Sequence, residues 1–308
     1  MDTDEWRDTD EWRGRLRAFA AELDARSVDV PGGRADLAEA FATASEALAR
    51  LHDVLGVGPG TATDAATDAG TPRLPPVEVV APVLGVDACR VGWVGAVLEP
   101  GAPRPRVVVA PTIAELVAMV RESLGLRVVG VDIPIGLPDK TIRQADRLAR
   151  AELKGKASSV FSTVTRSAYA ATTRAAADAV NRELVGQGVG AQAFALRDRI
   201  VEVDAWVRTR PTVTVIEVHP EVSFTAMTGT PILSGKKTDA GREERLAALA
   251  AAGIARPSVL QGQGYAADDV LDACAVAWTA ARRANGLARS LPDPPEVFSD
   301  GIPAAIWA

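Results

Sequence analysis

The chain has 308 residues, of which 47% are hydrophobic and 24% are charged, and its formal net charge is -6. This apolar content can fill one large core or two modest ones. The negative charge excludes a protein that coats nucleic acid through bulk electrostatics, although a local basic groove is compatible with it. Two cysteines are too few for a disulfide framework, and two histidines are too few for a histidine-rich zinc site. With no secretory segment, we expect the two cysteines to be reduced thiols and the protein to be cytoplasmic. No apolar run approaches the ~18 residues of a membrane span, so we expect no membrane contacts.

The N-terminal part of the sequence predicts two helices followed by a linker. Apolar residues recur at spacings of four and three along residues 12–23 and again along residues 37–55. A Val-Pro-Gly-Gly stretch separates them, so residues 1–55 are expected to form an α-helical hairpin. We expect its apolar stripe to pack on the main domain or on a second copy of the chain, as a homodimer. Residues 56–78, rich in Gly, Thr, Ala, Asp and Pro, are expected to be a flexible linker.

Residues 79–308 show strand and helix patterns in turn. The patterns predict strands at 83–87, 91–98 and 106–110, a helix at 113–124, a strand at 127–133, a helical region at 140–208, a strand at 212–218, and helices at 242–252 and 268–285. This succession is the order of elements in the ribonuclease H-like fold. The predicted fold class is therefore α/β, with a mixed five-stranded sheet of order 3-2-1-4-5 and a helical insertion between strands 4 and 5.

Two carboxylates stand where predicted strands end. Asp87 ends the first strand, and Asp132 ends the fourth. The order 3-2-1-4-5 makes these strands neighbours, so parallel strands would bring both residues to one edge of the sheet, where ligand sites of α/β proteins tend to lie. Taken singly, each of these residues is equally compatible with an Asp that caps a turn.

The last predicted helix adds Asp269 and Asp272, which share a helix face because they are three residues apart. The helix dipole alone explains an acid in the first turn, such as Asp269. Asp272 lies among apolar residues, where an unpaired carboxylate is costly unless it shares a cation. Asp87, Asp132, Asp269 and Asp272 therefore predict a site for Mg²⁺ or Mn²⁺, and two such ions suit in-line attack on a phosphodiester. Glu217, at the end of the fifth strand, is expected as a further ligand or as a neighbour of the ligands, and completes the predicted catalytic set.

Basic residues gather in the expected insertion. Arg143, Arg147 and Arg150 are spaced by four and three, which predicts a stripe on one helix face. The segment 154–161, Lys-Gly-Lys-Ala-Ser-Ser-Val-Phe, combines ammonium, hydroxyl and backbone N–H groups that suit phosphate oxygens. A solvated helix followed by an ordinary turn is equally compatible with the charges alone. The residues expected to contact substrate phosphate are Arg143, Arg147, Lys154, Lys156, Ser158, Ser159, Lys236 and Lys237.

Several motifs together resemble one known family. They are Gly85-Val86-Asp87 with Gly92-Trp93, the segment 131–137, Ala145-Asp146-Arg147 with the segment 158–161, the segment 217–224, Lys236-Lys237 and the segment 268–273. In this order they resemble domain-of-unknown-function family 429, regarded as predicted nucleases of the ribonuclease H-like fold, from about residue 79 to the C-terminus. The Asp269-x-x-Asp272-Ala273 element also resembles the last-helix motif of Holliday-junction resolvases of the RuvC type. The resemblance implies the fold and a nuclease activity.

The sequence is compatible with three functions. The first is a metal-dependent nuclease that hydrolyses phosphodiester bonds and has DNA or RNA as its partner. The second is a phosphotransferase or ATP-binding protein of the actin-like branch, which would need a Gly-rich phosphate loop after Asp87, where the chain has Ala-Cys-Arg-Val-Gly. The third is a non-catalytic binding or regulatory protein on the same fold. The retained carboxylates favour the nuclease.

Overall fold

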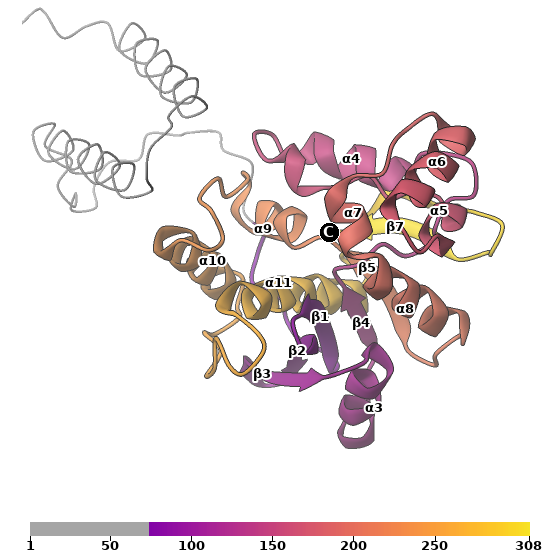
Figure 1. The fold of residues 1–308 in the computed structure, drawn as a ribbon. Helices are drawn as coiled ribbons and strands as arrows, with labels where there is room; N and C mark the ends of the chain where they lie inside the picture. Colours follow the sequence, from indigo (N-terminus) through magenta and orange to yellow (C-terminus); the bar gives the residue numbers. More distant parts are fainter. Residues whose placement is uncertain (1–73) are drawn as a thin grey trace, which may run out of the picture. The chain divides into compact units, whose positions relative to one another are not determined.

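The computed structural model describes residues 74–308. The predicted hairpin of residues 1–55, and the predicted linker as far as residue 73, lie outside the described residues. Residues 74–308 form a mixed α/β unit built around a seven-stranded sheet (Figure 1). None of the helices in this part of the chain has the length and apolarity needed to span a membrane.

The strand order of the sheet is β3-β2-β1-β4-β5-β7-β6. The strands are β1 (Val83–Cys89), β2 (Gly92–Glu99), β3 (Ala102–Ala110), β4 (Val128–Val131), β5 (Thr214–Val218), β6 (Ser290–Val297) and β7 (Pro303–Trp307). β1, β2 and β3 form an antiparallel meander, whereas β1, β4 and β5 run parallel, so the C-terminal ends of these three meet at one edge. The sheet exceeds the five predicted strands by β6 and β7, which extend it beyond β5.

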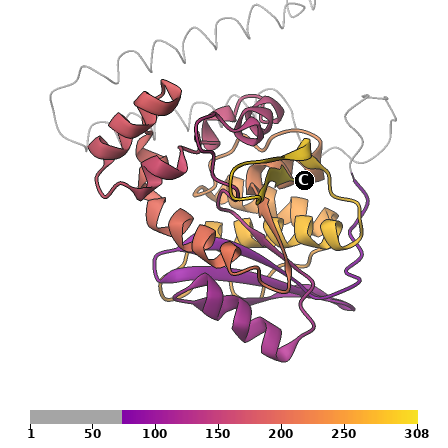
Figure 2. The ribbon, with the colours of Figure 1, turned by 90° about the vertical axis from the view of Figure 1, so that its right-hand side faces the viewer.

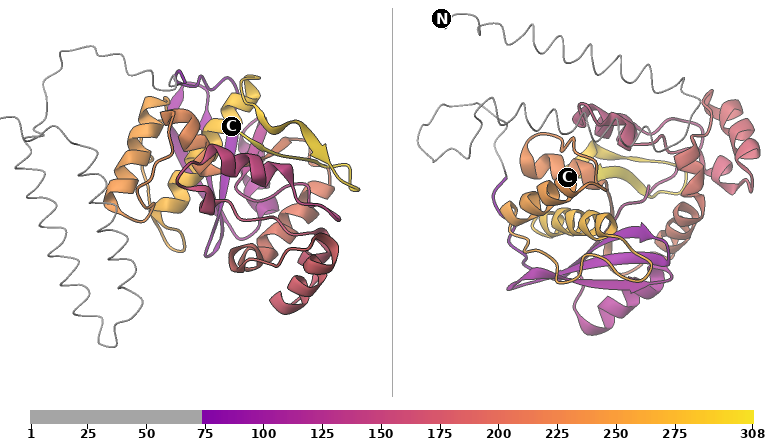
Figure 3. Two further views of the ribbon diagram at one scale, coloured as in Figure 1. Left: turned by 90° about the horizontal axis from the view of Figure 1, so that it is seen from above. Right: turned by 60° about the vertical axis from the view of Figure 1, so that its left-hand side comes forward.

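Helices cover both faces of the sheet (Figures 2 and 3). They are α3 (Ile113–Ser123), α4 (Gln144–Glu152), the short 3₁₀ helix η1 (Ala157–Ser159), α5 (Arg166–Ala170), α6 (Arg174–Val185), α7 (Ala191–Ala195), α8 (Arg197–Arg208), α9 (Pro220–Thr228), α10 (Asp239–Ala251) and α11 (Ala267–Ala284). α9, α10 and α11 pack on one face, and α3 and α8 on the other. The elements from α4 to α8 form an insertion between β4 and β5.

Side chains of the strands alternate between the two faces and build two separate cores. In β1, Val83 belongs to the core shared with α9, α10 and α11. Leu84 and Val86 belong to the opposite core, with α3 and α8. Because successive strand residues point to opposite faces, Gly85 and Asp87 lie on the α11 side. Asp87 is therefore directed to the layer that carries the predicted acidic helix.

Gly85 allows α11 to approach β1 closely. A Cβ at this position would lie 2.1 Å from the backbone nitrogen of Ala277 and 2.2 Å from the carbonyl oxygen of Ala273. Both are helix backbone atoms, which cannot move aside unless α11 shifts as a whole. The contact brings the first turns of α11, with Asp269 and Asp272, beside the C-terminal end of β1.

Gly85→Ala is expected to destabilise the protein by about 1–3 kcal/mol, because the added methyl group overpacks the contact between β1 and α11. Urea unfolding measures the change in the free energy of unfolding. Gly125→Ala is the matched control, since a Cβ there would meet nothing within 4 Å. Equal unfolding free energies for the two variants would contradict the close approach of α11.

Candidate functional site

The ends of β1 and β4 present the first two predicted carboxylates. Asp87 lies near the end of β1 and is 8% exposed, and Asp132 follows β4 and is half-buried. The Asp132 N–H donates to the Val86 carbonyl at 3.0 Å, which continues the parallel pairing of the two strands. The Oδ1 of Asp87 accepts a hydrogen bond from the Ala88 N–H at 2.7 Å. The structure thus brings Asp87 and Asp132 to one edge of the sheet.

Asp272 joins these residues from α11. It is 3% exposed, and its Oδ2 accepts a hydrogen bond from the Nζ of Lys236 at 2.8 Å. Its Oδ1 is buried and has no hydrogen-bond partner in the described part of the chain. The Nζ of Lys236 also lies 3.9 Å from the Oδ2 of Asp268. Lys236, a predicted phosphate contact, is therefore held among the carboxylates.

Asp87, Asp132 and Asp272 form what we call the carboxylate cluster, and their charges influence one another. Burial, followed by the charges of Asp132 and Asp272, raises the pKa of Asp87 well above its ordinary value. Burial and the charge of Asp272 do the same to the pKa of Asp132. Burial also raises the pKa of Asp272, against the opposing charge of Lys236. One ammonium group faces three carboxylates, so the cluster favours a further cation.

The charge of Lys236 is fixed by the same neighbours. Burial favours the neutral amine, but the charges of Asp272, Asp87 and Asp132 outweigh burial and raise the pKa of Lys236 above its ordinary value. The side chain is 43% exposed, so the ammonium group can reach solvent as well as the cluster. Lys236 is therefore a protonated donor at the border between the cluster and solvent.

Asp269 lies at the margin of the cluster. Its Oδ2 accepts a hydrogen bond from the Ala266 N–H at 2.9 Å, which caps the first turn of α11. Burial is the main cause that raises the pKa of Asp269. Its charge is also one of the smaller causes that raise the pKa of Asp87. The helix-capping interpretation of this residue therefore fits its contacts best.

The donor chemistry of the cluster suits a hard divalent cation. In residues 74–308, no three His, Cys, Asp or Glu side chains are gathered closely enough to form a ready-made metal site. The cluster nevertheless offers oxygen donors that repel one another, and one buried oxygen of Asp272 lacks a partner. These properties fit Mg²⁺ or Mn²⁺. Asp87, Asp132 and Asp272 are the side chains that would hold the ion.

Glu217 lies in a buried ion pair with Arg143. Its Oε2 accepts hydrogen bonds from the Nη2 of Arg143 at 2.6 Å and from the Ile135 N–H at 2.7 Å. Burial raises the pKa of Glu217, and the guanidinium of Arg143 opposes that shift. Arg143 is fully buried at the start of α4, with its Nε 3.8 Å from Asp146. The predicted roles of Glu217 as a metal ligand and of Arg143 as a phosphate contact do not fit these positions, because each side chain is occupied by the other.

A cavity of about 250 Å³ opens beside the carboxylate cluster. Its lining combines Asp132, Asp272 and Lys236 with Lys156 and Ser159, from the segment predicted to contact phosphate. The Nζ of Lys156 donates to the Ile232 carbonyl at 2.7 Å and lies 2.8 Å from the carboxylate of Glu221. The Oγ of Ser159 is buried and has no partner within the described residues. Three predicted phosphate contacts therefore line the cavity that adjoins the cluster.

The other predicted phosphate contacts lie elsewhere. Arg147, Lys154, Ser158 and Lys237 are exposed and are not part of the cavity lining. Arg150 donates to the Val160 carbonyl at 2.9 Å and to the Ser162 hydroxyl at 2.8 Å. The predicted basic stripe on α4 is wrong, because Arg143 is buried and Arg150 is bound to the following loop. Arg147 alone of the three is exposed.

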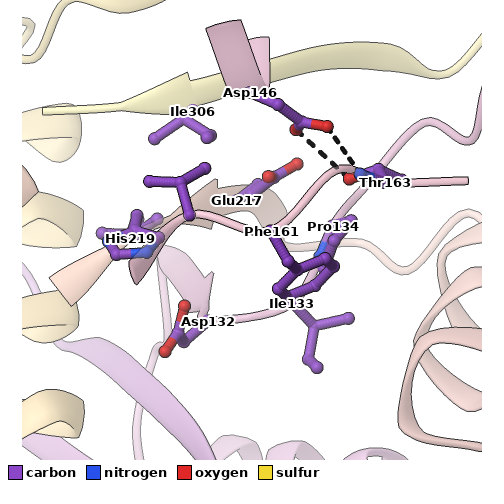
Figure 4. Close-up of a pocket in the computed structure, with 11 residues that line it drawn as sticks. Asp132, Ile133, Pro134, Asp146, Phe161, Thr163, Glu217, His219 and Ile306 are labelled. Atoms are coloured by element: carbon purple, nitrogen blue, oxygen red, sulfur yellow. Dashed lines mark hydrogen bonds between the residues drawn. The ribbon is translucent and has the colours of Figure 1, made fainter. Parts of the chain in front are cut away.

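A smaller cavity of about 30 Å³ shares Asp132, Phe161 and His219 with the larger one (Figure 4). The Nε2 of His219 lies 3.3 Å from the Ser159 carbonyl, and its Nδ1 is buried without a partner in the described region. Burial lowers the pKa of His219, so the ring is neutral near pH 7. On the far side of this cavity, Asp146 accepts from the N–H and the hydroxyl of Thr163, at 2.7 and 3.2 Å.

Sequence reasoning gave no role to several residues of the larger cavity. Phe161 stands in the lysine- and serine-bearing segment, but an aromatic residue there carried no signal of its own. Gln192 lies in the insertion between β4 and β5, and no motif in that part of the sequence marked it as a residue of the site. Glu221 follows His219-Pro220 and is held by Arg245 at 2.6 Å as well as by Lys156. Glu221 lies in the family-like segment 217–224, but nothing in that segment indicates its contacts with Lys156 and Arg245.

The fold and the site define a mixed α/β protein with a carboxylate cluster at the C-terminal ends of two parallel strands. A family model described as "Protein of unknown function (DUF429)" matches residues 85–297, and the chain belongs to this family. The motifs of the sequence predicted this membership, and the matched range contains the whole carboxylate cluster. No curated protein and no solved structure matches the chain.

Proposed function

We propose that the protein is a metal-dependent nuclease that hydrolyses phosphodiester bonds of DNA or RNA. The observation that carries the proposal is the carboxylate cluster. Burial raises the pKa of Asp87, Asp132 and Asp272, the charge of Asp272 adds to this shift in the other two, and Lys236 opposes it in all three. Such a cluster destabilises the metal-free fold, which is typical of groups retained for function. The run β3-β2-β1-β4-β5 within the sheet supports a ribonuclease H-like fold as part of the proposal.

Different residues of the chain have different roles at this site. A divalent ion held by the cluster would polarise a phosphate oxygen and lower the pKa of an attacking water. Lys236 and Ser159 line the adjoining cavity and can donate hydrogen bonds to phosphate oxygens. Other phosphates of a bound nucleic acid can be contacted by the exposed side chains of Arg147, Lys154, Ser158 and Lys237. Glu217 and Arg143 form a buried ion pair, so their role in the site is structural.

The connection after Asp87 disfavours the nucleotide-binding alternative. β1 ends at Cys89 and β2 begins at Gly92, so only Arg90 and Val91 join the two strands. A turn this short has no room for a loop whose N–H groups surround a phosphate chain. We further propose that the protein works in the cytoplasm, which the free thiols of Cys89 and Cys274 support.

A cleavage panel tests the proposed function. Single-stranded, duplex and branched DNA and RNA are incubated with Mn²⁺ and the wild-type protein, Asp87→Asn or Asp198→Asn, the last changed at a side chain that is 91% exposed. We expect metal-dependent cleavage by the wild type and by Asp198→Asn, and a rate lowered by about 100-fold or more in Asp87→Asn. Cleavage that Asp87→Asn retains, or no cleavage of any substrate, would contradict the proposal.

Lys236→Met is expected to strengthen Mg²⁺ binding by about tenfold, which corresponds to about 1.4 kcal/mol. The reason is that the ammonium group on Asp272 competes with the ion for the same carboxylate. The same variant is expected to cleave more slowly, because it loses a phosphate donor. Calorimetric titration with Mg²⁺ measures the affinity, and Lys237→Met, at the exposed neighbouring residue, is the control. Unchanged affinity in Lys236→Met would argue against an ion beside Asp272.

A further inference from the structure

The cavity of about 250 Å³ beside the carboxylate cluster has an apolar and amide-bearing part that the chemistry of hydrolysis does not use. Phe161, from the loop after η1, and Leu196, at the junction of α7 and α8, line it together with the amide of Gln192 in α7. Charged groups such as Lys236 and Asp132 suit a phosphate and its metal. An aromatic ring, an aliphatic side chain and an amide suit a flat group with polar edges. The lining therefore matches the two halves of a nucleotide.

Phe161 is placed to act as a stacking surface. It is half-buried and packs against the core that contains residues of α3 and α8, which restricts the motion of its side chain. Figure 4, which draws the smaller cavity, shows the ring of Phe161 and the carboxylate of Asp132 in its lining, and both residues also line the cavity of about 250 Å³. Aromatic rings held in this way stack on bases with little sequence preference. A base on Phe161 would place its neighbouring phosphate close to Asp132.

The size of the cavity restricts the kind of nucleic acid. A volume of about 250 Å³ has room for one nucleotide to enter. A base inside a duplex must unpair and leave the stack before it can enter such a pocket, whereas a base in a single strand is already available. Polar contacts to the exposed edge of the base, such as the amide of Gln192 can make, are then open to the protein.

We propose that this cavity binds one unpaired nucleotide of a single strand, with its base stacked on Phe161 and its edge contacted by Gln192. The inference rests on the proposed nuclease function and names the substrate class of the same site. Single-stranded DNA or RNA is then the preferred substrate, and a duplex binds only where a base is extruded.

Fluorescence anisotropy with the full-length protein tests this inference. The probes are a fluorescein-labelled 12-nucleotide single strand, the same sequence as a duplex, and the single strand with one central abasic site, all at one fixed salt concentration. We expect the wild type to bind the single strand at least about tenfold more tightly than the duplex, and the abasic strand less tightly than the intact one. Phe161→Leu should lose about tenfold in affinity for the single strand and lose the distinction between intact and abasic strands, whereas Phe161→Tyr should retain both.

Thermal unfolding of the Phe161 variants shows whether they are folded, and Gln192→Ala, at an exposed position, provides a second variant that is expected to fold. Gln192→Ala should reduce the differences in affinity among homopolymer strands of different bases. Equal binding of single strand and duplex, or wild-type affinity in folded Phe161→Leu, would overturn the inference. The proposed nuclease would survive that result if metal-dependent cleavage still required Asp87. If the protein bound single strands through Phe161 but cleaved no substrate, the proposed nucleotide-binding pocket would be supported and the proposed nuclease function would be contradicted.

Discussion

Asp132→Asn is expected to raise the melting temperature of the metal-free protein and to remove its stabilisation by Mg²⁺. Burial and the charge of Asp272 hold the pKa of Asp132 well above its ordinary value of 3.8, so the ionised carboxylate opposes folding near pH 7. A neutral amide of the same shape relieves this repulsion but is a poorer ligand. We expect a gain of about 1 kcal/mol, or roughly 2–4 °C for a domain of this size.

Differential scanning calorimetry with and without Mg²⁺ measures both effects, and Asp198→Asn is the control that should change neither. The gain should shrink as the pH falls toward 4. A carboxyl with a raised pKa contributes stability that is present below its ordinary pKa and is lost as the pH rises through its pKa in the folded state, so the wild type approaches the variant in acid. An Asp132→Asn protein that is less stable than the wild type at pH 7 without metal would contradict the account.

Arg143→Met is expected to lower the free energy of unfolding by about 3–5 kcal/mol, because it leaves Glu217 buried without its counter-charge. The guanidinium is fully buried and lies 2.6 Å from the carboxylate. Only the Ile135 N–H would remain as a hydrogen-bond partner of that Oε2 in the described structure. Urea unfolding is the appropriate measurement.

Two further variants are needed to interpret the stability of Arg143→Met. Arg147→Met changes an exposed arginine of the same helix and should unfold like the wild type. The double variant Arg143→Met with Glu217→Leu removes both charges and should recover much of the lost stability, since apolar pairs often replace buried ion pairs without loss. If Arg143→Met were as stable as the wild type but bound oligonucleotides more weakly, the prediction would be wrong and Arg143 would contact the substrate.

The elements with clear local patterns could be predicted from the sequence. The helix at 113–124 is confirmed as α3, with the Thr112 hydroxyl accepting from the Glu115 N–H at 3.2 Å as its N-cap. β6 could not be recognised in the same way, because its segment contains Pro292, Pro294 and Pro295, which argue against a strand. The strand is compatible with these prolines because it lies at the edge of the sheet.

The site was predictable where its residues stand at the ends of strands. Asp87 and Asp132 could be placed together because the strand that precedes each one is readable in the sequence. Glu217 follows the same rule, yet it pairs with Arg143, which lies 74 residues earlier in the insertion. Nothing in the local pattern joins these two residues, or joins Lys236 to Asp272 across 36 residues. Pairings of this kind are decided by how the insertion folds back on the sheet.

Calorimetric titration of the wild-type protein and Asp87→Asn with Mn²⁺ tests the central claim most directly, because it asks for the metal without assuming a substrate. We expect the wild type to bind Mn²⁺, since the three buried carboxyl groups of Asp87, Asp132 and Asp272 face only one ammonium group, that of Lys236. We also expect Asp87→Asn to bind at least about tenfold more weakly. A wild-type protein that does not bind Mn²⁺, or an Asp87→Asn protein that binds it equally well, would contradict the claim.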